Sequence, residues 1–410
     1  MAGLILEIVW SKYLSYLLGN SIYGVSTVVA AFLGGLGIGA AWGGRLASRS
    51  KSPLAAYGRL EALVGLLALA SPLVFLAAPP LFAMIYDLVG GYGPGFFALR
   101  FAFLFCVLLL PTTAMGATLP LLVEHLDRKE AGQNRRRPVR SGGAVARLYA
   151  INTAGAVTGV LLAGYFLIPA HGLAVSAVFA AAIDFAVATL VLLSRPAPFA
   201  RPGVDLTTEV EAAGHGAPED AGHDGRQAIA APTLLDRFLL PMFALSGLTA
   251  ILYQVAWTRI LAIPFGGMVY AFSAILALYL LGLSLGAAGA ARALRRSADP
   301  WSLFAALQIG LAAAVAFGTH YFGSIPHGQA SVIAASQGSM TALLLGEARI
   351  AALVVMPPTL FLGALFPVAV AIHRRRVADA GAATGSVYAA NTVGSIAGSI
   401  LTAFVLIPAF

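Results

Sequence analysis

Charged side chains inside long apolar stretches are the residues of this sequence best placed to do chemistry. Burying a charge among apolar groups costs several kcal/mol unless the charge is paired or hydrated. We therefore expect each such side chain either to have a partner or to serve a function. The set comprises Glu7, Lys12, Glu61, Arg100, Asp184, Arg259 and Arg349, with Glu347 at the edge of its stretch.

Two of these carboxylates have amides at the corresponding positions of an internal repeat. The sequence matches itself at an offset of 247 residues, which pairs Glu7 with Gln254 and Glu61 with Gln308. The first copy therefore carries two acids where the second carries two neutral side chains of the same shape.

The two carboxylates allow a structural interpretation. Glu7 would pair with Lys12 or reach water, and Glu61 would pair with Arg59 or Arg45. The carboxylates would then only stabilise the fold.

A functional interpretation is that Glu7 and Glu61 converge on a cation site that opens to the cytoplasm. Trp10 or Tyr57 would add cation–π attraction to such a site. Asp184 has no evident partner in the sequence, so we expect it to be a protonated acid or a proton-coupling group.

Catalytic and metal chemistry have little support. The seven histidines are dispersed among loops, Cys106 is the single cysteine, and no H-E-x-x-H pattern occurs. We predict no catalytic residue, no metal site and no cofactor.

Two proline-bounded segments, "PTTAMGATLP" (111–120) and "PTLFLGALFP" (358–367), match in the repeat. A proline inside a helix frees a backbone carbonyl and bends the helix. Matching interruptions in two repeats are a pointer to the central site of a transporter, although packing alone also explains them. The predicted gating residues are Pro111, Gly116, Pro120, Pro358, Gly363 and Pro367.

One helical stretch is written twice, as "LYAINTAGAVTGVLLAGYFLIPA" (148–170) and "VYAANTVGSIAGSILTAFVLIPA" (387–409). Each copy contains a Gly-x-x-x-Gly pattern, which lets another helix approach closely. Asn152 and Asn391 occupy matching positions, where their amides would bond a neighbouring helix or contact a ligand.

Composition indicates a polytopic α-helical membrane protein. Charged residues make up 10% of the chain, against roughly 25% in soluble domains, and hydrophobic residues 59%. Apolar runs of about 20 residues are long enough to cross a bilayer. We predict eleven spans: 4–18, 21–44, 57–78, 96–122, 146–169, 172–194, 236–262, 268–293, 302–319, 348–371 and 385–409. We expect an interfacial turn with a short helix at 78–93 and a loop at 320–345.

The basic residues predict the orientation. Most Lys and Arg lie in 45–59, 128–147, 195–237, 292–296 and 374–376, which alternate with loops that lack them. The positive-inside rule places these segments and the N-terminus in the cytoplasm of a cell whose inner (plasma) membrane holds the protein. The net charge of +8 then reflects topology, and we expect membrane lipids, not nucleic acid, as partners.

The repeat predicts the domain organisation. The first repeat covers 1–194 with six helices, a flexible cytoplasmic linker covers 195–235, and the second repeat covers 236–410 with five helices. An even number of spans gives both repeats the same orientation. We expect the missing sixth helix of the second repeat beyond residue 410.

The motifs "YGVSTVVAAFLGGLGIG", "GATLP" and "YAINTAGAVTG", each repeated, resemble the membrane region of the fused transporter-like/spermidine synthase family. The resemblance covers nearly the whole chain and implies an MFS-like bundle with a pseudo-two-fold axis, joined in the family to a cytoplasmic aminopropyltransferase domain. That catalytic domain is not recognisable here. "GGLGIG" (34–39) lies inside a span without a preceding strand, so it is not a nucleotide loop.

Three functions remain open at this point. The first is a transporter-like domain that binds or moves a polyamine or another small cationic solute. The second is a non-transporting anchor or assembly subunit for other membrane subunits or for an aminopropyltransferase domain. The third is a substrate vestibule for such an enzyme.

Overall fold

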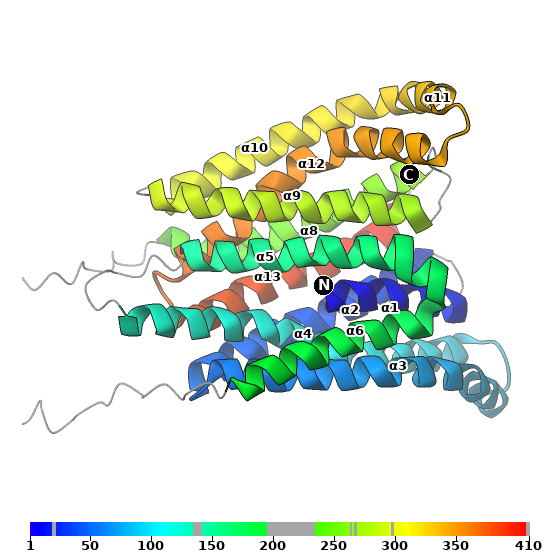
Figure 1. The fold of residues 1–410 in the computed structure, drawn as a ribbon, viewed down its shortest axis with the longest axis horizontal. Coiled ribbons are helices and arrows are strands. Elements are labelled where there is room, and N and C mark those ends of the chain that lie inside the picture. The colour runs from blue at the N-terminus through cyan, green and yellow to red at the C-terminus, as the bar shows by residue number, and fades with distance from the viewer. Residues whose placement is uncertain are drawn as a thin grey trace, which may run out of the picture.

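The structure is a computed structural model, which describes residues 1–18, 22–133, 142–194, 234–262, 265, 269–296 and 299–406. All elements in these ranges are helical, and they lie side by side in one elongated bundle (Figure 1). The first half of the chain contains α1 (Ala2–Leu18), α2 (Ile22–Arg49), α3 (Pro53–Val89), α4 (Pro94–Gln133), α5 (Gly142–Leu162) and α6 (Ile168–Leu193). The second half contains α8 (Leu234–Ala262), α9 (Val269–Arg296), α10 (Pro300–Tyr321), α11 (Ile325–Ser336), α12 (Met340–His373) and α13 (Ala380–Leu401).

Each of the eleven predicted segments overlaps a helix, and two expectations for the connections were wrong. The segment predicted as an interfacial turn with a short helix at 78–93 instead continues α3 through Pro79 and Pro80 as far as Val89. Gly90 then ends the helix in a left-handed conformation (φ 77°), which costs a glycine little. The segment predicted as a loop at 320–345 contains α11, which begins with Pro326 in its first turn, where a missing N–H is harmless. The predicted linker lies almost wholly outside the described residues.

Seven segments of the described chain are long and apolar enough to cross a membrane, so the chain is a helical membrane protein. The number of spans predicted from sequence, eleven, is not established. One segment combines α5 with α6, although the backbone of α6 breaks at Gly172 (φ 75°), and α1 has only 17 residues. The segments are Pro53–Val89, Pro94–Glu130, Gly143–Leu193, Asp236–Thr258, Phe272–Arg296, Pro300–Ser336 and Met340–His373.

Helices at corresponding positions of the two halves make corresponding contacts. α2 packs on α4, as α9 packs on α12. A Cβ atom added at Gly39 would overlap the carbonyl oxygen of Thr113, and one added at Gly286 would overlap that of Leu360. Both contacts need glycine, because only its missing side chain lets the two backbones approach this closely.

The two halves exchange contacts through the doubled helices. α13 packs on α2, and α5 packs on α9. In the second of these contacts the Ser284 hydroxyl donates a hydrogen bond to the Ala150 carbonyl at 2.8 Å. Both doubled stretches end in a π-helical turn, at Ala163–Leu167 and at Thr402–Leu406.

Charged residues join the halves at one end of the bundle, on the left in Figure 1. Asp127 at the end of α4 accepts a hydrogen bond from Arg374 at the end of α12 at 2.7 Å. These two residues occupy equivalent positions in the repeat, 247 residues apart. Nearby, the buried Glu124 accepts from the backbone N–H of Gly381 at 2.8 Å, and Arg128 donates to Glu124 at 2.8 Å.

Candidate functional site

Glu7 is half-buried on α1, and its carboxyl group is an electrostatic neighbour of the Tyr388 side chain on α13. α1 itself packs on α6, α5 and α2 of the first half. A carboxyl group of the first half is thus an electrostatic neighbour of an aromatic side chain of the second half.

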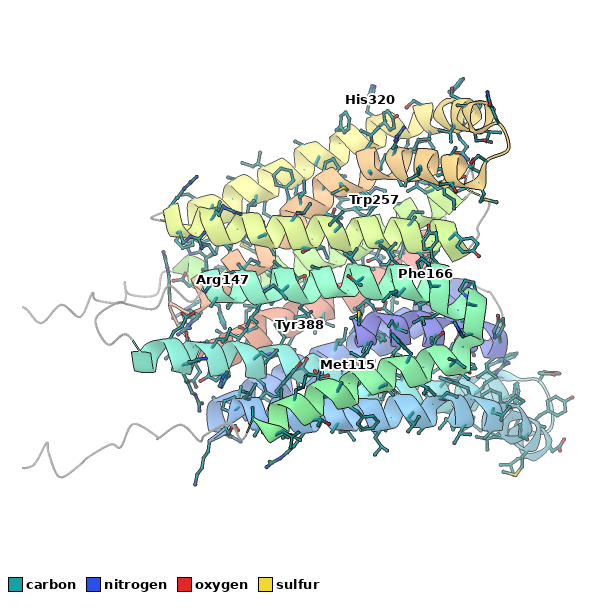
Figure 2. All side chains as sticks on the ribbon, viewed as in Figure 1. Met115, Arg147, Phe166, Trp257, His320 and Tyr388 are labelled. Atoms are coloured by element: carbon teal, nitrogen blue, oxygen red, sulfur yellow. The ribbon has the colours of Figure 1, made fainter. Side chains whose placement is uncertain are left out.

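Tyr388 belongs to a group of aromatic residues near the middle of the bundle (Figure 2). The ring of Phe366 on α12 lies 5.9 Å from that of Tyr388 and 4.7 Å from that of Tyr149 on α5. Tyr149 is also an electrostatic neighbour of Tyr388 and of Tyr279 on α9. We call Tyr149, Tyr279 and Tyr388 the central tyrosine cluster.

The doubled sequence explains how this cluster forms. Tyr149 and Tyr388 occupy the same position in the two copies of the stretch. In each copy the threonine one turn later donates its hydroxyl to the tyrosine carbonyl, from Thr153 at 2.7 Å and from Thr392 at 2.9 Å. These bonds satisfy the buried hydroxyl groups within their own helices. The rings of both tyrosines lie against the same side chain, Phe366 of the second half.

Glu7 and the central tyrosine cluster offer the groups that bind an organic cation. A carboxylate supplies the opposite charge, and aromatic faces attract a cation through their quadrupoles. No hydrogen bond of the three phenol hydroxyls is found within the described part of the chain.

A second acidic group lies inside the first half, between α3 and α6. Glu61 is an electrostatic neighbour of both Asp184 and Tyr57. Gly65 permits this arrangement, because its backbone lies close to Asp184, whose Cβ is 3.3 Å from where a glycine Cβ would stand. Asp184, for which the sequence indicated no partner, is thus the neighbour of Glu61.

The structure therefore separates the two carboxylates that the sequence placed together. Asp184 is an electrostatic neighbour of Glu61, whereas Tyr388 is one of Glu7. Among the described residues, none of Lys12, Arg59 and Arg45 forms an ion pair with either carboxylate.

The remaining predicted binding residues are dispersed. The indole of Trp10 is buried and donates to the Ser71 hydroxyl at 3.0 Å, so it belongs to the core of the first half. Asn152 is exposed on α5, whereas Asn391 packs against Gly247 of α8. The amides of the second half also lie apart: Gln254 lines a small cavity with Trp257 and Tyr279, and Gln308 is half-buried on α10.

The predicted gating segments lie in continuous helices. α4 runs unbroken through Pro111 and Pro120, and α12 runs unbroken through Pro358 and Pro367. The glycines of these segments make tight helix contacts, at Gly116 with Leu36 and at Gly363 with Leu283.

Comparison with known proteins gives one relevant similarity. No family model matches the chain. The chain is 29% identical over 199 residues to the "Polyamine aminopropyltransferase 2" of Streptomyces coelicolor. The similar region covers 47% of this chain and 31% of that protein, so the chain spans about a third of the relative's length.

Sequence reasoning missed all four members of this aromatic group, Tyr149, Tyr279, Phe366 and Tyr388, as site residues. The identity of Tyr149 and Tyr388 in the repeat was a signal that could have pointed to two of them. Tyr279 gives no such signal, because the residue at its matching position is Phe32. In the described part of the chain, no group of three His, Cys, Asp or Glu side chains is arranged to hold a metal ion.

The other charged groups inside the helices have different surroundings. Arg100 lies over the Phe82 ring, 5.1 Å from its centre, and Glu347 accepts a hydrogen bond from Gln329 at 2.9 Å. Arg349 is exposed on α12 and has no acidic partner among the described residues.

Proposed function

We propose that this chain is a transporter-like membrane domain that binds a small organic cation between its two halves. The observation that carries the proposal is that Glu7 of the first half is an electrostatic neighbour of Tyr388 of the second. A cation held by groups from both halves would bind more tightly to the closed arrangement of the halves than to an open one. This difference in affinity would let the solute shift the equilibrium toward the closed arrangement.

The arrangement of equivalent residues supports an MFS-like architecture with two repeats in the same orientation. Asp127 and Arg374 are equivalent in sequence and bond to each other. Tyr149 and Tyr388 are also equivalent and are electrostatic neighbours. Equivalent residues meet where a two-fold axis passes between them.

The topology that we propose follows from these repeats. Residues 1–194 form the first repeat, 195–235 a cytoplasmic linker and 236–410 the second repeat. The basic end of the bundle faces the cytoplasm across the inner membrane, in accord with the positive-inside rule.

The proposed solute is a polyamine or a chemically similar amine. The name of the Streptomyces coelicolor relative connects similar sequences with polyamines. A chain of ammonium groups suits a site that combines a carboxylate with several aromatic rings. Glu61 and Asp184 provide a second acidic position in the first half, with the Met1 ammonium as an electrostatic neighbour.

The test is spermidine binding to the purified chain in detergent, measured by calorimetry. We expect Glu7→Gln to weaken binding by about tenfold or more, since it removes the charge and keeps the shape. Glu130→Gln is the matched control, because Glu130 is an exposed partner of Arg147 at the basic end. Unchanged spermidine affinity in Glu7→Gln would end the proposal of this site.

The second candidate is a non-transporting anchor for an aminopropyltransferase domain. It is favoured by the similarity to a protein of which the chain covers 31%. Proteoliposomes distinguish the two: a transporter takes up radiolabelled spermidine, and uptake falls in Glu7→Gln. An anchor shows no uptake and co-purifies with a soluble aminopropyltransferase.

A further inference from the structure

An apolar groove runs along the outer surface of the second half, away from the central tyrosine cluster. It lies among α9, α10 and α12 and has a volume of about 770 Å³. In Figure 1, α9 and α10 are close at the basic end and diverge toward α11. Glycine and alanine on α9 form one wall, leucines of α10 another, and the floor is formed by α12.

Arg349 is the single charged side chain among the residues that line this groove. It is exposed, and no acidic side chain in the described ranges pairs with it. The nearest acid along the helix, Glu347, is buried and bonded to Gln329. Residues two apart on a helix do not face each other, so Glu347 is not available to Arg349.

The position of Arg349 along α12 matches the level of lipid headgroups. A hydrocarbon core takes about 20 residues of helix. Counting back from Arg374, at the basic end, the far edge of the core lies near residue 354. Arg349 is then a little more than one turn beyond that edge, where a long cationic side chain meets phosphates.

The length of the groove fits a single acyl chain. Its lining runs along α12 from Arg349 to Ala364, which at 1.5 Å per residue is about 22 Å. One leaflet accounts for about half of a core that is about 30 Å thick. On α12 the groove therefore extends from the headgroup level to about the middle of the core, and Ala293 and Leu303 continue its lining toward the basic ends of α9 and α10.

We propose that this groove binds an acidic phospholipid of the leaflet opposite the basic end. The guanidinium of Arg349 would hold the phosphate and acidic headgroup, and one acyl chain would lie along Gly289, Leu307 and Leu353. Arginine suits this role because its planar fork bonds phosphate oxygens in pairs. The site is independent of the proposed solute site.

The experiment is native mass spectrometry of the delipidated full chain, titrated with phosphatidylglycerol or phosphatidylcholine. We expect the first phosphatidylglycerol to bind about tenfold more tightly than phosphatidylcholine, and Arg349→Gln to abolish that preference. Arg292→Gln is the control, because Arg292 is an exposed arginine of α9 that does not line the groove.

A second variant tests the groove itself. A Cβ atom at Gly289 would meet no atom within 4 Å, so Gly289→Leu fills the groove without disturbing the backbone contacts of α9. We expect it to weaken binding of both lipids, with an unchanged circular-dichroism spectrum. The proposal is wrong if phosphatidylglycerol and phosphatidylcholine bind alike, if Arg292→Gln matches Arg349→Gln, or if Gly289→Leu binds lipid normally.

Discussion

In the first half of the molecule Gly116 of α4 lies against the backbone of Leu36, and in the second half Gly363 of α12 lies in the same way against Leu283. The polar contacts of the two halves do not match in this way. Glu124 ties α4 to the start of α13, whereas the equivalent residue on α12 is Ala371.

The acidic groups show the same difference. Glu61 has Asp184 and Tyr57 as electrostatic neighbours within the first half, whereas its equivalent on α10 is Gln308. The comparison teaches that backbone packing was kept in both copies, while charged side chains became specific to one of them. Packing sets the fold, and the unmatched charges mark where the halves can differ in function.

The largest expected effect comes from the contact of Glu124 with the start of α13, which has no counterpart in the second half. Glu124 is 3% exposed and accepts from both Arg128 and the Gly381 N–H. Glu124→Ala leaves these donors without their acceptor, and we expect a loss of about 3–5 kcal/mol in stability. Thermal unfolding in detergent measures it. Glu130→Ala, which breaks the exposed pair with Arg147, should cost no more than about 1 kcal/mol. Equal losses of stability in Glu124→Ala and Glu130→Ala would contradict the importance of the Glu124 contacts.

The next effect tests the shared packing. Gly116→Ala and Gly363→Ala each place a Cβ atom onto a backbone carbonyl oxygen of the neighbouring helix. We expect each to destabilise the protein by about 1–3 kcal/mol, as overpacking does, and by similar amounts. Gly289→Ala is the control, because its Cβ would enter open space. If only one of the two substitutions lowered the melting temperature, the two packing seams would not be equivalent.

The smallest effect concerns the helix caps that precede α3 and α10. Ser52 and Asp299 are equivalent in the repeat, and each accepts hydrogen bonds from backbone N–H groups of the helix that follows. Bonds from the Ser302 hydroxyl and N–H and from the Trp301 N–H lower the pKa of Asp299 below its ordinary value. A carboxylate with a lowered pKa stabilises the fold above its ordinary pKa of about 3.9, and the contribution is lost as the pH falls through the lower folded value.

We therefore expect Asp299→Ala to cost about 1 kcal/mol at neutral pH. The difference from the unmodified protein should shrink when the pH falls below about 4. Ser52→Ala removes a cap without a titrating group, so its cost should not change with pH. Unfolding temperatures measured from neutral pH to below pH 4 check this, and a pH-independent cost for Asp299→Ala would contradict it.

Sequence alone determined the class of the protein and the positions of its helices. Long apolar runs leave a backbone no alternative to helix in a membrane, so the predicted segments coincide with helices of the structure. The doubled motifs also indicated which glycines would lie against the backbone of a neighbouring helix. A glycine at the same position of both copies has few other physical causes. The ends of α3 and the presence of α11 escaped prediction, since proline and short polar loops allow both helix and turn.

Only the tertiary structure decided which polar groups meet. Glu7 and Glu61 looked alike in the sequence, yet Glu7 is an electrostatic neighbour of Tyr388, whereas the contact of α3 with α6 makes Asp184 the neighbour of Glu61. Helix periodicity fixes the spacing of side chains along one helix but not the rotation of that helix against its neighbours. That rotation depends on close contacts between segments far apart in the chain, and it decides which charges share a site.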